Sequence, residues 1–391
     1  MSWENVRLGD VCNVIAGYAF KSELFKNEGI PLLRISNIVE GEISFKEECV
    51  RVEDSKSSSL SKFKVQKNDI LVALSGATTG KFGVYKLDQV AFLNQRVGLI
   101  RATKKLDQRY FYHYLNILKK EIMHTAQGAA QPNISTNEII DFQIPLPPLP
   151  IQKRIAEILD AADALKRKDQ ELLKKYDELA QAIFINMFGE PVKNEKGWEV
   201  KTICEFGEIS TGNTPPRADV ENYDSKYIEW IKTDNIDEDM LFVTNSSEYL
   251  SKKGAKRGRI TPSGSLLVAC IAGGIESIGR AALTDREVSF NQQINSIEPN
   301  SNVKSLFLYF LFKYSRKHIQ NQASNGMKRM LSKGEFEKIK MILPDLNVQQ
   351  EFENKIGQLI IQKEQMRHTF FNSQNLFNSL IQKAFKGELV A

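Results

Sequence analysis

Two long stretches of the chain place apolar residues at alternating steps of three and four, which is the spacing of a coiled-coil seam. The first runs from Ile155 until Gly189 and Pro191 stop the helix, and the second runs from Phe352 to Gly387. Each predicted helix is about 35 to 38 residues long, or roughly 55 Å. The apolar seam residues are Ile155, Ile158, Leu165, Leu172, Tyr176, Leu179 and Ile183 in the first helix, and Phe352, Ile356, Leu359, Met366, Phe370, Phe377 and Leu380 in the second.

So narrow an apolar stripe needs a partner, and the chain supplies a second helix of matching length. We therefore expect the two helices to pair as an antiparallel coiled coil that holds the globular parts of the chain apart. The alternative is that each helix packs only on its own domain. Asp169 and Lys363 interrupt the two seams with opposite charges, and either they set the register or they reach solvent at the edge of the stripe.

The rest of the chain repeats itself. A continuous apolar run followed by a glycine-containing loop occurs at 70–73 and again at 266–269, which predicts the same buried strand and loop twice. The matched landmarks are Trp3-Glu4 and Trp198-Glu199, Asn94-Gln95 and Asn291-Gln292, and Ser135 and Ser332. From Asn94 to Asn291 the offset is 197 residues, which is the size of a domain. A chain built as a pseudo-dimer is expected to bind a target with two-fold character.

Short strands, turns and one late helix make up each globular stretch, with helices expected at 110–123 and 306–322. Proline-containing corners at 145–150 and 344–347 should not be helical, since proline lacks an amide donor and restricts the residue before it. The predicted fold class is α+β, with two similar mixed α/β domains separated by two long helices that form an antiparallel coiled coil. The expected boundaries are 1–150, 151–188, 189–347 and 348–391.

Composition narrows the class of protein. A content of 42% hydrophobic and 26% charged residues is ordinary for a globular chain. We expect a cytoplasmic protein, because no apolar run approaches a membrane span and the start of the sequence does not resemble a signal peptide. The cysteines are scattered (Cys12, Cys49, Cys204 and Cys270), which indicates reduced thiols rather than disulfides or a zinc site.

The position of the positive charge says more than the net charge of +5. No acidic residue lies between Glu248 and Glu276, and none lies between Asp54 and Asp69. The basic residues of these two stretches are Lys252, Lys253, Lys256, Arg257 and Arg259 in the second, and Lys56, Lys62, Lys64 and Lys67 in the first. A single basic run is usually a solvated loop, but its recurrence just before the buried strand of each copy favours contact with a phosphate backbone.

Motifs of catalysis are missing from the sequence. The segment 76–81 differs from a nucleotide-binding P-loop, because three residues instead of four separate its glycines and Phe82 stands where Ser or Thr would bind magnesium. The four histidines lack metal-ligand spacing, and neither an adenine-methyltransferase motif nor a glycine-rich cofactor fingerprint occurs. We therefore expect no active site and no bound cofactor.

The alternation of two globular units with two matching helices resembles the specificity subunit of type I restriction-modification enzymes. In the first copy the resemblance rests on 17–22, 34–38, Asn94-Gln95, and 144–148 leading to Gln152. In the second it rests on 211–215, 232–236, and 342–344 leading to Gln349. Asp345 and Asn347 depart from the proline-rich corner of the first copy, which puts the subunit contacts of that corner in doubt.

The resemblance implies a division of labour. Each globular unit would be a target recognition domain that reads one half of a bipartite sequence in double-stranded DNA, and the helices would set the spacer and dock modification subunits, expected to be two. Those partners would bind S-adenosylmethionine and methylate adenine, which requires base flipping. Restriction subunits, which use ATP, would translocate and cut unmodified DNA.

Two groups of residues are the candidates for DNA binding. The basic stretches would position phosphates, and polar or basic loop residues would read bases. The readout candidates are Lys21, Arg34, Asn37, Thr79, Lys81, Lys232, Asn235, Arg280, Lys328 and Arg329. For the two Asn-Gln pairs we favour a backbone-anchoring role, and for Tyr18, Phe20 and Phe25 we favour packing over base stacking.

Two other classes of protein remain open at this stage. One is the specificity part of a type IIB enzyme, whose single partner would carry nuclease motifs. The other is a stand-alone enzyme acting on DNA, which the missing catalytic constellation argues against. The base sequences of the two half-sites cannot be derived, because loop conformation decides them.

Overall fold

The structure is a computed structural model that describes residues 3–39, 41–45, 49–53, 60–126, 132–324 and 329–390. It divides into two compact units. Unit 1 comprises residues 1–170 and 368–391, and unit 2 comprises 171–367. Each unit therefore contains one globular domain together with one half of each long helix. No helix in the part of the chain that the structure describes is long and apolar enough to cross a membrane.

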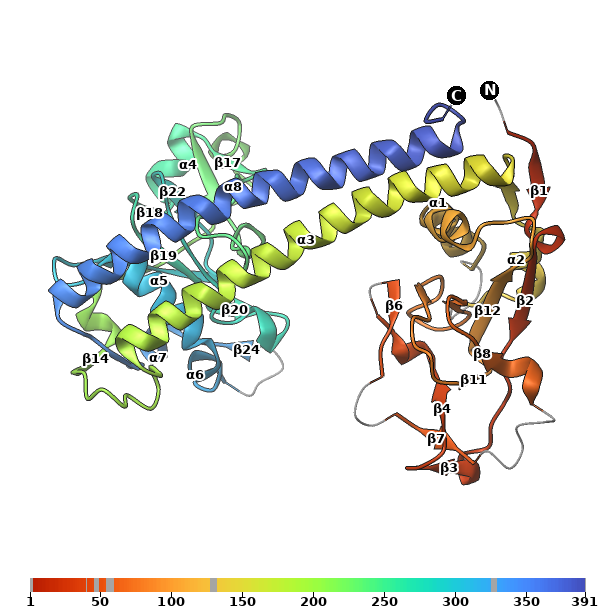
Figure 1. The fold of residues 1–391 in the computed structure, drawn as a ribbon. Helices are drawn as coiled ribbons and strands as arrows, with labels where there is room; N and C mark the ends of the chain where they lie inside the picture. Colours follow the sequence, from red (N-terminus) through yellow and green to blue (C-terminus); the bar gives the residue numbers. More distant parts are fainter. Residues whose placement is uncertain are drawn as a thin grey trace. The chain divides into compact units, whose positions relative to one another are not determined.

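Unit 1 contains two main sheets and a small one (Figure 1). The first has the order β2-β12-β9-β10-β6-β5, the second β3-β7-β4-β11-β8, and β1 pairs with β13. The strands are β1 (Asn5–Arg7), β2 (Cys12–Ala16), β3 (Phe25–Lys26), β4 (Ile30–Leu33), β5 (Ile38–Val39), β6 (Gly41–Ile43), β7 (Arg51–Val52), β8 (Lys64–Val65), β9 (Ile70–Ala73), β10 (Phe82–Val84), β11 (Ala91–Leu93), β12 (Val97–Ala102) and β13 (Gln143–Pro145). The helices are α1 (Gln108–Ala126), α2 (Thr136–Asp141) and the first half of α3 (Leu149–Phe188).

Unit 2 repeats this plan. Its main sheets have the orders β15-β23-β19-β21 and β17-β16-β22-β18, while β14 pairs with β25 and β20 with β24. The strands are β14 (Val200–Thr202), β15 (Gly207–Thr211), β16 (Ile228–Ile231), β17 (Tyr249–Leu250), β18 (Ile260–Thr261), β19 (Leu266–Ala269), β20 (Ile271–Ala272), β21 (Ala281–Leu283), β22 (Val288–Phe290), β23 (Ile294–Pro299), β24 (Arg329–Met330) and β25 (Lys340–Ile342). The helices are the second half of α3, α4 (Lys252–Arg257), α5 (Ser305–Tyr314), α6 (Arg316–Gln320), α7 (Lys333–Glu337) and the first half of α8 (Leu346–Phe385), whose second half belongs to unit 1.

The two units share one topology. The order β2-β12-β9-β10 corresponds to β15-β23-β19-β21, and the parallel pair of β4 with β11 corresponds to the parallel pair of β16 with β22. A side chain at Gly17 or Gly212 would meet the carbonyl oxygen of Asn94 or Asn291 at 2.1 or 2.2 Å, so only glycine fits at either crossing. The predicted α+β fold class and internal repeat are confirmed.

Within each unit the halves of the long helices pack against each other and against the sheet domain. In unit 1 the core joins the start of α3, at Ile155 and Leu159, to the end of α8, at Phe377 and Ile381. In unit 2 the end of α3 meets the start of α8, where the ring centroids of Phe188 and Phe352 lie 5.2 Å apart. The helices therefore run antiparallel in each unit (Figure 1). Packing on the domain and pairing between helices, taken above as alternatives, occur together.

The predicted seam of α8 follows the burial in the structure, whereas that of α3 needs correction. Leu165 and Leu179 are 46% and 48% exposed, and Ala180, next to Leu179, is buried instead. The reason is that α3 must face its own sheet domain as well as α8, so its buried positions do not keep a strict heptad. Ile158, Leu172, Tyr176, Ile183, Met366, Phe370 and Leu380 are half-buried, while Phe352, Ile356 and Leu359 are buried.

Asp169 and Lys363, the charged residues that interrupt the two seams, have different environments. Lys363 donates a hydrogen bond from Nζ to Oδ1 of Asp177 at 2.6 Å, on the opposite helix of unit 2. Asp169 is buried in unit 1, and its Oδ2 has no partner among the described residues. Lys363 therefore pairs with a residue that the spacing did not single out.

Two boundaries differ from those predicted. Helix α3 begins at Leu149 and α8 at Leu346, inside the corners that were expected not to be helical. Pro150 is tolerated because the first turn of a helix needs no amide donor. The single helix expected at 306–322 is broken at Ser315 into α5 and α6, and after the break the Arg316 guanidinium reaches the carbonyl oxygen of Ile278.

A buried glutamine fastens each long helix to its domain. Gln152 accepts from the amide of Asp107 at 2.8 Å and donates to the carbonyl of Pro147 at 2.8 Å. Gln349 accepts from the amide of Lys304 at 2.9 Å and donates to the carbonyl of Pro344 at 2.7 Å. Each side chain thereby ties the first turn of the helix to the proline corner and to the loop before the domain helix.

Replacing Gln349 by Leu should lower the free energy of unfolding by about 2–4 kcal/mol, because it leaves buried backbone groups without partners. Gln350, the adjacent residue, donates to Asn354 near the surface, so Gln350→Leu should cost less than about 0.5 kcal/mol. Urea unfolding of both variants tests this, and equal losses would mean that Gln349 does not fasten the helix.

Candidate nucleic-acid interface

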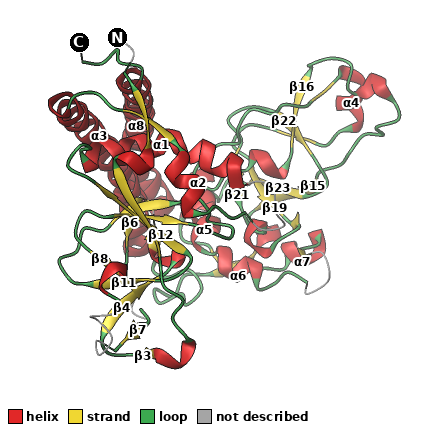
Figure 2. Ribbon diagram, turned by 90° about the vertical axis from the view of Figure 1, so that its right-hand side faces the viewer, coloured by secondary structure: helices red, strands yellow, loops and turns green. Residues whose placement is uncertain are grey.

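The basic stretch of unit 2 forms the short helix α4. Ser251 caps its N-terminus, accepting from the amide of Gly254 at 3.0 Å, and buried Gly254 and Ala255 fix the helix on the domain. The cationic side chains of this stretch are left exposed: Lys252, Lys253, Lys256, Arg257 and Arg259. Figure 2 shows α4 beside β16 and β22, at the end of unit 2 away from β19 and β23.

Acidic side chains from another loop neutralise part of this stretch. Lys253 contacts Glu221 at 2.6 Å and Asp219 at 3.0 Å, and Arg257 contacts Asp219 at 3.1 Å. The hydrogen bond from Lys253 lowers the pKa of the Asp219 carboxyl below its usual value, and Coulomb attraction to both cations acts in the same direction. Within the described residues, Lys252, Lys256 and Arg259 have no such ion pair, so they are the cations available to a phosphate.

The basic stretch of unit 1 is less well defined. Lys56 lies outside the described residues. Lys62 lies over the ring of Phe63 at 4.9 Å, Lys64 is half-buried in β8, and Lys67 is paired with Asp88 at 2.8 Å. The equivalence of the two basic stretches in the sequence does not extend to their side-chain environments.

Each unit places a cation over an aromatic ring at the end of its central parallel strand. After β4, the Arg34 guanidinium lies 4.8 Å from the Phe25 ring centroid. After β16, the Lys232 amine lies 5.3 Å from the Trp230 ring centroid and forms an ion pair with Glu248. The hydrogen bond that the Lys232 amine donates to Glu248 lowers the pKa of this carboxyl below its usual value.

Three readout candidates are held by the fold itself. Asn37 is 8% exposed; its side chain accepts from the amide of Arg34 at 2.8 Å and donates to the carbonyl of Ser44 at 3.0 Å. Asn235 makes the same turn with the amide of Lys232 at 3.0 Å. Thr79 is 3% exposed and donates to the carbonyl of Gly76 at 2.7 Å. These side chains shape the loops that carry Arg34, Lys232 and Lys81.

The remaining candidates fall into three groups. Lys21 and Lys81 are exposed. Arg280 turns toward the neighbouring loop, donating to the carbonyl of Thr233 at 3.3 Å, and its Nε is buried with no partner among the described residues. Lys328 and the side chain of Arg329 lie outside the described part of the chain.

Arg217 is a residue that sequence reasoning missed. Its guanidinium lies 4.6 Å from the ring centroid of Tyr223 and 4.9 Å from that of Trp230, and it contacts Glu248 at 2.6 Å. Glu248 thus holds both Arg217 and Lys232. The sequence signal for Arg217 was the pair of prolines before it, which stiffens the loop. The sequence does not reveal that Glu248 lies beside Arg217 in the folded chain.

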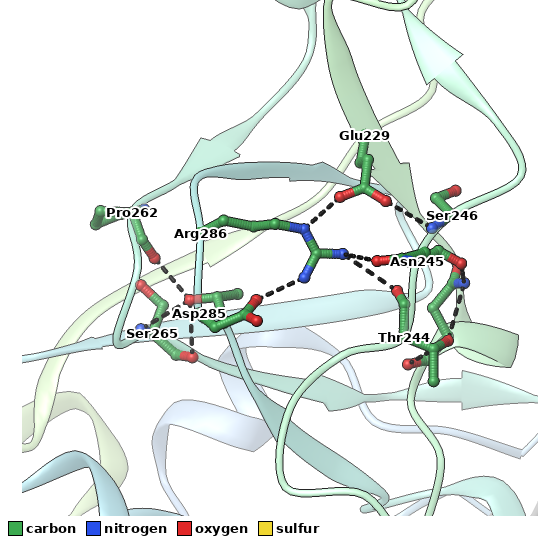
Figure 3. Close-up of polar contacts among 10 residues, drawn as sticks. Glu229, Thr244, Asn245, Ser246, Pro262, Ser265, Asp285 and Arg286 are labelled. Atoms are coloured by element: carbon green, nitrogen blue, oxygen red, sulfur yellow. Dashed lines mark hydrogen bonds and ion pairs between the residues drawn. The ribbon is translucent and has the colours of Figure 1, made fainter.

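A second arginine of this domain is occupied by structural contacts. Arg286 donates from Nε to Glu229 and from Nη1 to Asp285, while Nη2 lies 3.4 Å from both the Thr244 carbonyl and the Asn245 side-chain oxygen (Figure 3). Glu229 also accepts from the amide of Ser246 at 2.8 Å. This network fixes the 244–248 loop, and with it the position of Glu248.

The Asn-Gln pairs and the aromatic candidates have mixed environments. Asn291 is buried and accepts from the amide of Gln293 at 3.0 Å, which is a backbone anchor. Gln95 and Gln292 are exposed. Tyr18 is partly exposed and packs edge-on to Phe20, with ring centroids 5.0 Å apart.

The described residues offer little for redox or metal chemistry. Burial raises the pKa of the Cys12 and Cys270 thiols to about 12, so neither is a thiolate at neutral pH. No group of three or more His, Cys, Asp or Glu side chains within the described ranges could hold a metal ion.

Comparison with known proteins points to one family. The model for the type I restriction modification DNA specificity domain matches residues 1–175 and 195–368. The EcoBI specificity subunit of Escherichia coli is 24% identical across 100% of this chain and 87% of its own length. The MjaVIII specificity subunit of Methanocaldococcus jannaschii is 33% identical over 183 residues, which are 44% of this chain and 43% of that relative. The type I S subunit structure from M. genitalium covers 98% of this chain and 96% of its own at 17% identity, with a TM-score of 0.61, and so shares the fold.

Proposed function

This chain belongs to the type I restriction modification DNA specificity family, and we propose that it is the sequence-specific DNA-binding subunit of a type I restriction-modification complex. It is a recognition component and not an enzyme. The observation that carries this function is that the family model matches both halves of the chain. The relatives named above are type I specificity subunits, which favours this function over a type IIB system or a stand-alone enzyme.

Membership of this family, together with the internal repeat, supports a division of labour. The two globular domains each read one half of a bipartite target in double-stranded DNA, and the helices α3 and α8 set the distance between the halves. Modification subunits supply S-adenosylmethionine and methyl transfer, and restriction subunits supply ATP-driven cleavage. The complex acts in the cytoplasm, where its DNA substrate lies.

Exposed apolar side chains on the long helices support docking of the modification subunits there. Contiguous apolar surface that is exposed on a globular protein marks a site of contact with a partner. The exposed apolar residues on these helices are Leu165 and Leu179 on α3, and Ile361, Phe371 and Leu376 on α8.

Different cations contribute to DNA affinity and to the reading of the base sequence. The exposed Lys252, Lys256 and Arg259 suit phosphate positioning, because a mobile point charge binds phosphate regardless of sequence. Arg34 and Lys232, held over aromatic rings at the end of the central strand, suit base contact.

The function is tested by expressing the chain with and without its modification subunit in cells that lack adenine methylation. We expect methylated adenines in a bipartite motif only when both are present. Sequencing of methylated sites gives the answer, and methyl transfer by the purified chain alone would refute the non-catalytic assignment.

Replacing Lys252, Lys256 and Arg259 by Ala should weaken binding of target and non-target DNA by similar factors. The slope of log affinity against log salt should flatten by about 2 to 3, since each phosphate contact contributes about 0.9. Changing Asp219 to Asn and Glu221 to Gln should have the opposite effect, because Lys253 and Arg257 lose their ion pairs. If the triple variant instead loses discrimination at defined base pairs, positioning and readout are assigned the wrong way round.

Four residues inserted after Lys174 should lengthen α3 by about 6 Å. On B-DNA that is nearly two base pairs at about 3.4 Å each. We expect methylated sites with both half-sites unchanged and a spacer longer by about one or two base pairs, provided that the paired helix tolerates a small register shift. Lys174→Ala, which keeps the helix length, is the control. An unchanged spacer would mean that the helices do not set the distance.

A further inference from the structure

We propose that Arg217 is a base-reading residue of the second recognition domain and that it contacts the major-groove edge of a guanine. The proposal rests on the function assigned above and adds a residue and a base to it. It follows from how the fold holds the guanidinium, which of its donors are left unused, and how the surrounding charge is balanced.

The loop that carries Arg217 is tied down on both sides. Before it, Asn213 donates to the carbonyl of Arg257 at 2.6 Å and accepts from the amide of Arg259 at 2.7 Å. After it, buried Asn222 donates to the carbonyl of Pro216 at 3.0 Å, and the Tyr223 hydroxyl donates to the carbonyl of Pro215 at 2.6 Å. The backbone position of Arg217 is therefore fixed before any ligand binds.

Three side chains fix the guanidinium itself. The rings of Tyr223 and Trp230 lie within 5 Å of it, and Glu248 binds Nη2 at 2.6 Å. Trp230 is only 2% exposed, and its indole nitrogen donates to the carbonyl of Asn213 at 3.3 Å, so this aromatic platform cannot move away. An arginine ordered in advance loses little conformational entropy when it binds.

Most donors of Arg217 remain unused. A guanidinium carries five N–H groups, and within the described residues Arg217 donates a single hydrogen bond, to Glu248. Its side chain is 55% exposed. Arg286, in contrast, donates from all three of its nitrogens to protein acceptors (Figure 3). Arg286 therefore stabilises a loop, whereas Arg217 presents unused N–H donors in a fixed geometry to an acceptor outside the protein.

The balance of charge favours a base over a phosphate. Glu248 pairs with both Arg217 and Lys232, so two cations share one carboxylate and the net attraction for a phosphate is reduced. The pairing with Glu248 leaves the other N–H donors of Arg217 unused and fixed in direction. A fixed, planar pair of N–H donors matches O6 and N7 of guanine, which both accept in the major groove.

The test uses the full chain in complex with its modification subunit and maps methylated sites in cells. Arg217→Gln should lower the preference for G·C at one base pair of one half-site by about 10- to 100-fold. The other half-site should stay unchanged. Arg217→Lys should relax the same base pair, because an ammonium group cannot make the two-pronged contact.

Arg316→Lys is the matched control, since it removes an arginine of the same domain whose guanidinium donates to the carbonyl of Ile278 and to Glu238, and within the described residues it does not contact the 244–248 loop that carries Glu248. It should lower the melting temperature and leave both half-site sequences as they were. A uniform loss of binding in the Arg217 variants would assign this residue to a phosphate and overturn the proposal. An unchanged sequence preference, with or without a lower melting temperature, would also overturn the proposal. The same holds if the affected half-site contains no G·C pair. Failure of the wild-type complex to methylate a bipartite motif would instead refute the proposed function.

Discussion

The structure depends on covering the apolar face of two 40-residue helices. Neither helix can leave that face in water, and burial of each large apolar side chain contributes about 1.5–3 kcal/mol. In each unit the face is covered jointly by the opposite helix and by the sheet domain, as where Phe184 contacts Phe307 of α5 and Phe352 of α8. The helices are thus part of the core of each recognition domain, and they cannot move independently of it. Gln152 and Gln349 reinforce this at the first turn of each helix, where a buried amide replaces water as the partner of three backbone groups.

That arrangement explains which parts of the molecule repeat and which diverge. The elements nearest the helices, β2-β12-β9-β10 and their counterparts β15-β23-β19-β21, keep the same order because they must form the same core. Farther from the helices, α4 occurs between β17 and β18 of unit 2, and its cationic side chains are exposed. Loops there can change sequence without altering the packing of α3 and α8.

The sequence predicts the structural features that depend on periodicity. It does not predict those that depend on contacts between residues far apart in the chain. The α8 seam from Phe352 to Phe377 was readable because one apolar stripe faces one direction. The α3 seam failed at Leu165 and Leu179 because that helix faces two neighbours at once. Basic residues were found from composition, but composition could not reveal that Asp219, more than thirty residues away, neutralises Lys253. Arg217 escaped notice for the same reason, since the pairing with Glu248 exists only in the folded chain.

The contrast between paired and unpaired cations bears on how one domain combines affinity with specificity. If every lysine and arginine on this surface were free, electrostatic attraction would dominate and non-specific DNA would compete with the target. Pairing Lys232 and Arg217 with Glu248 reduces the attraction that any sequence would feel, while it orients the donors that only one base satisfies. Lys252 and Lys256 in α4 and Arg259 just after it have no ion pair within the described residues, and on the proposed function they would supply the sequence-independent part. Specificity in this domain therefore depends as much on its acidic residues as on its basic ones.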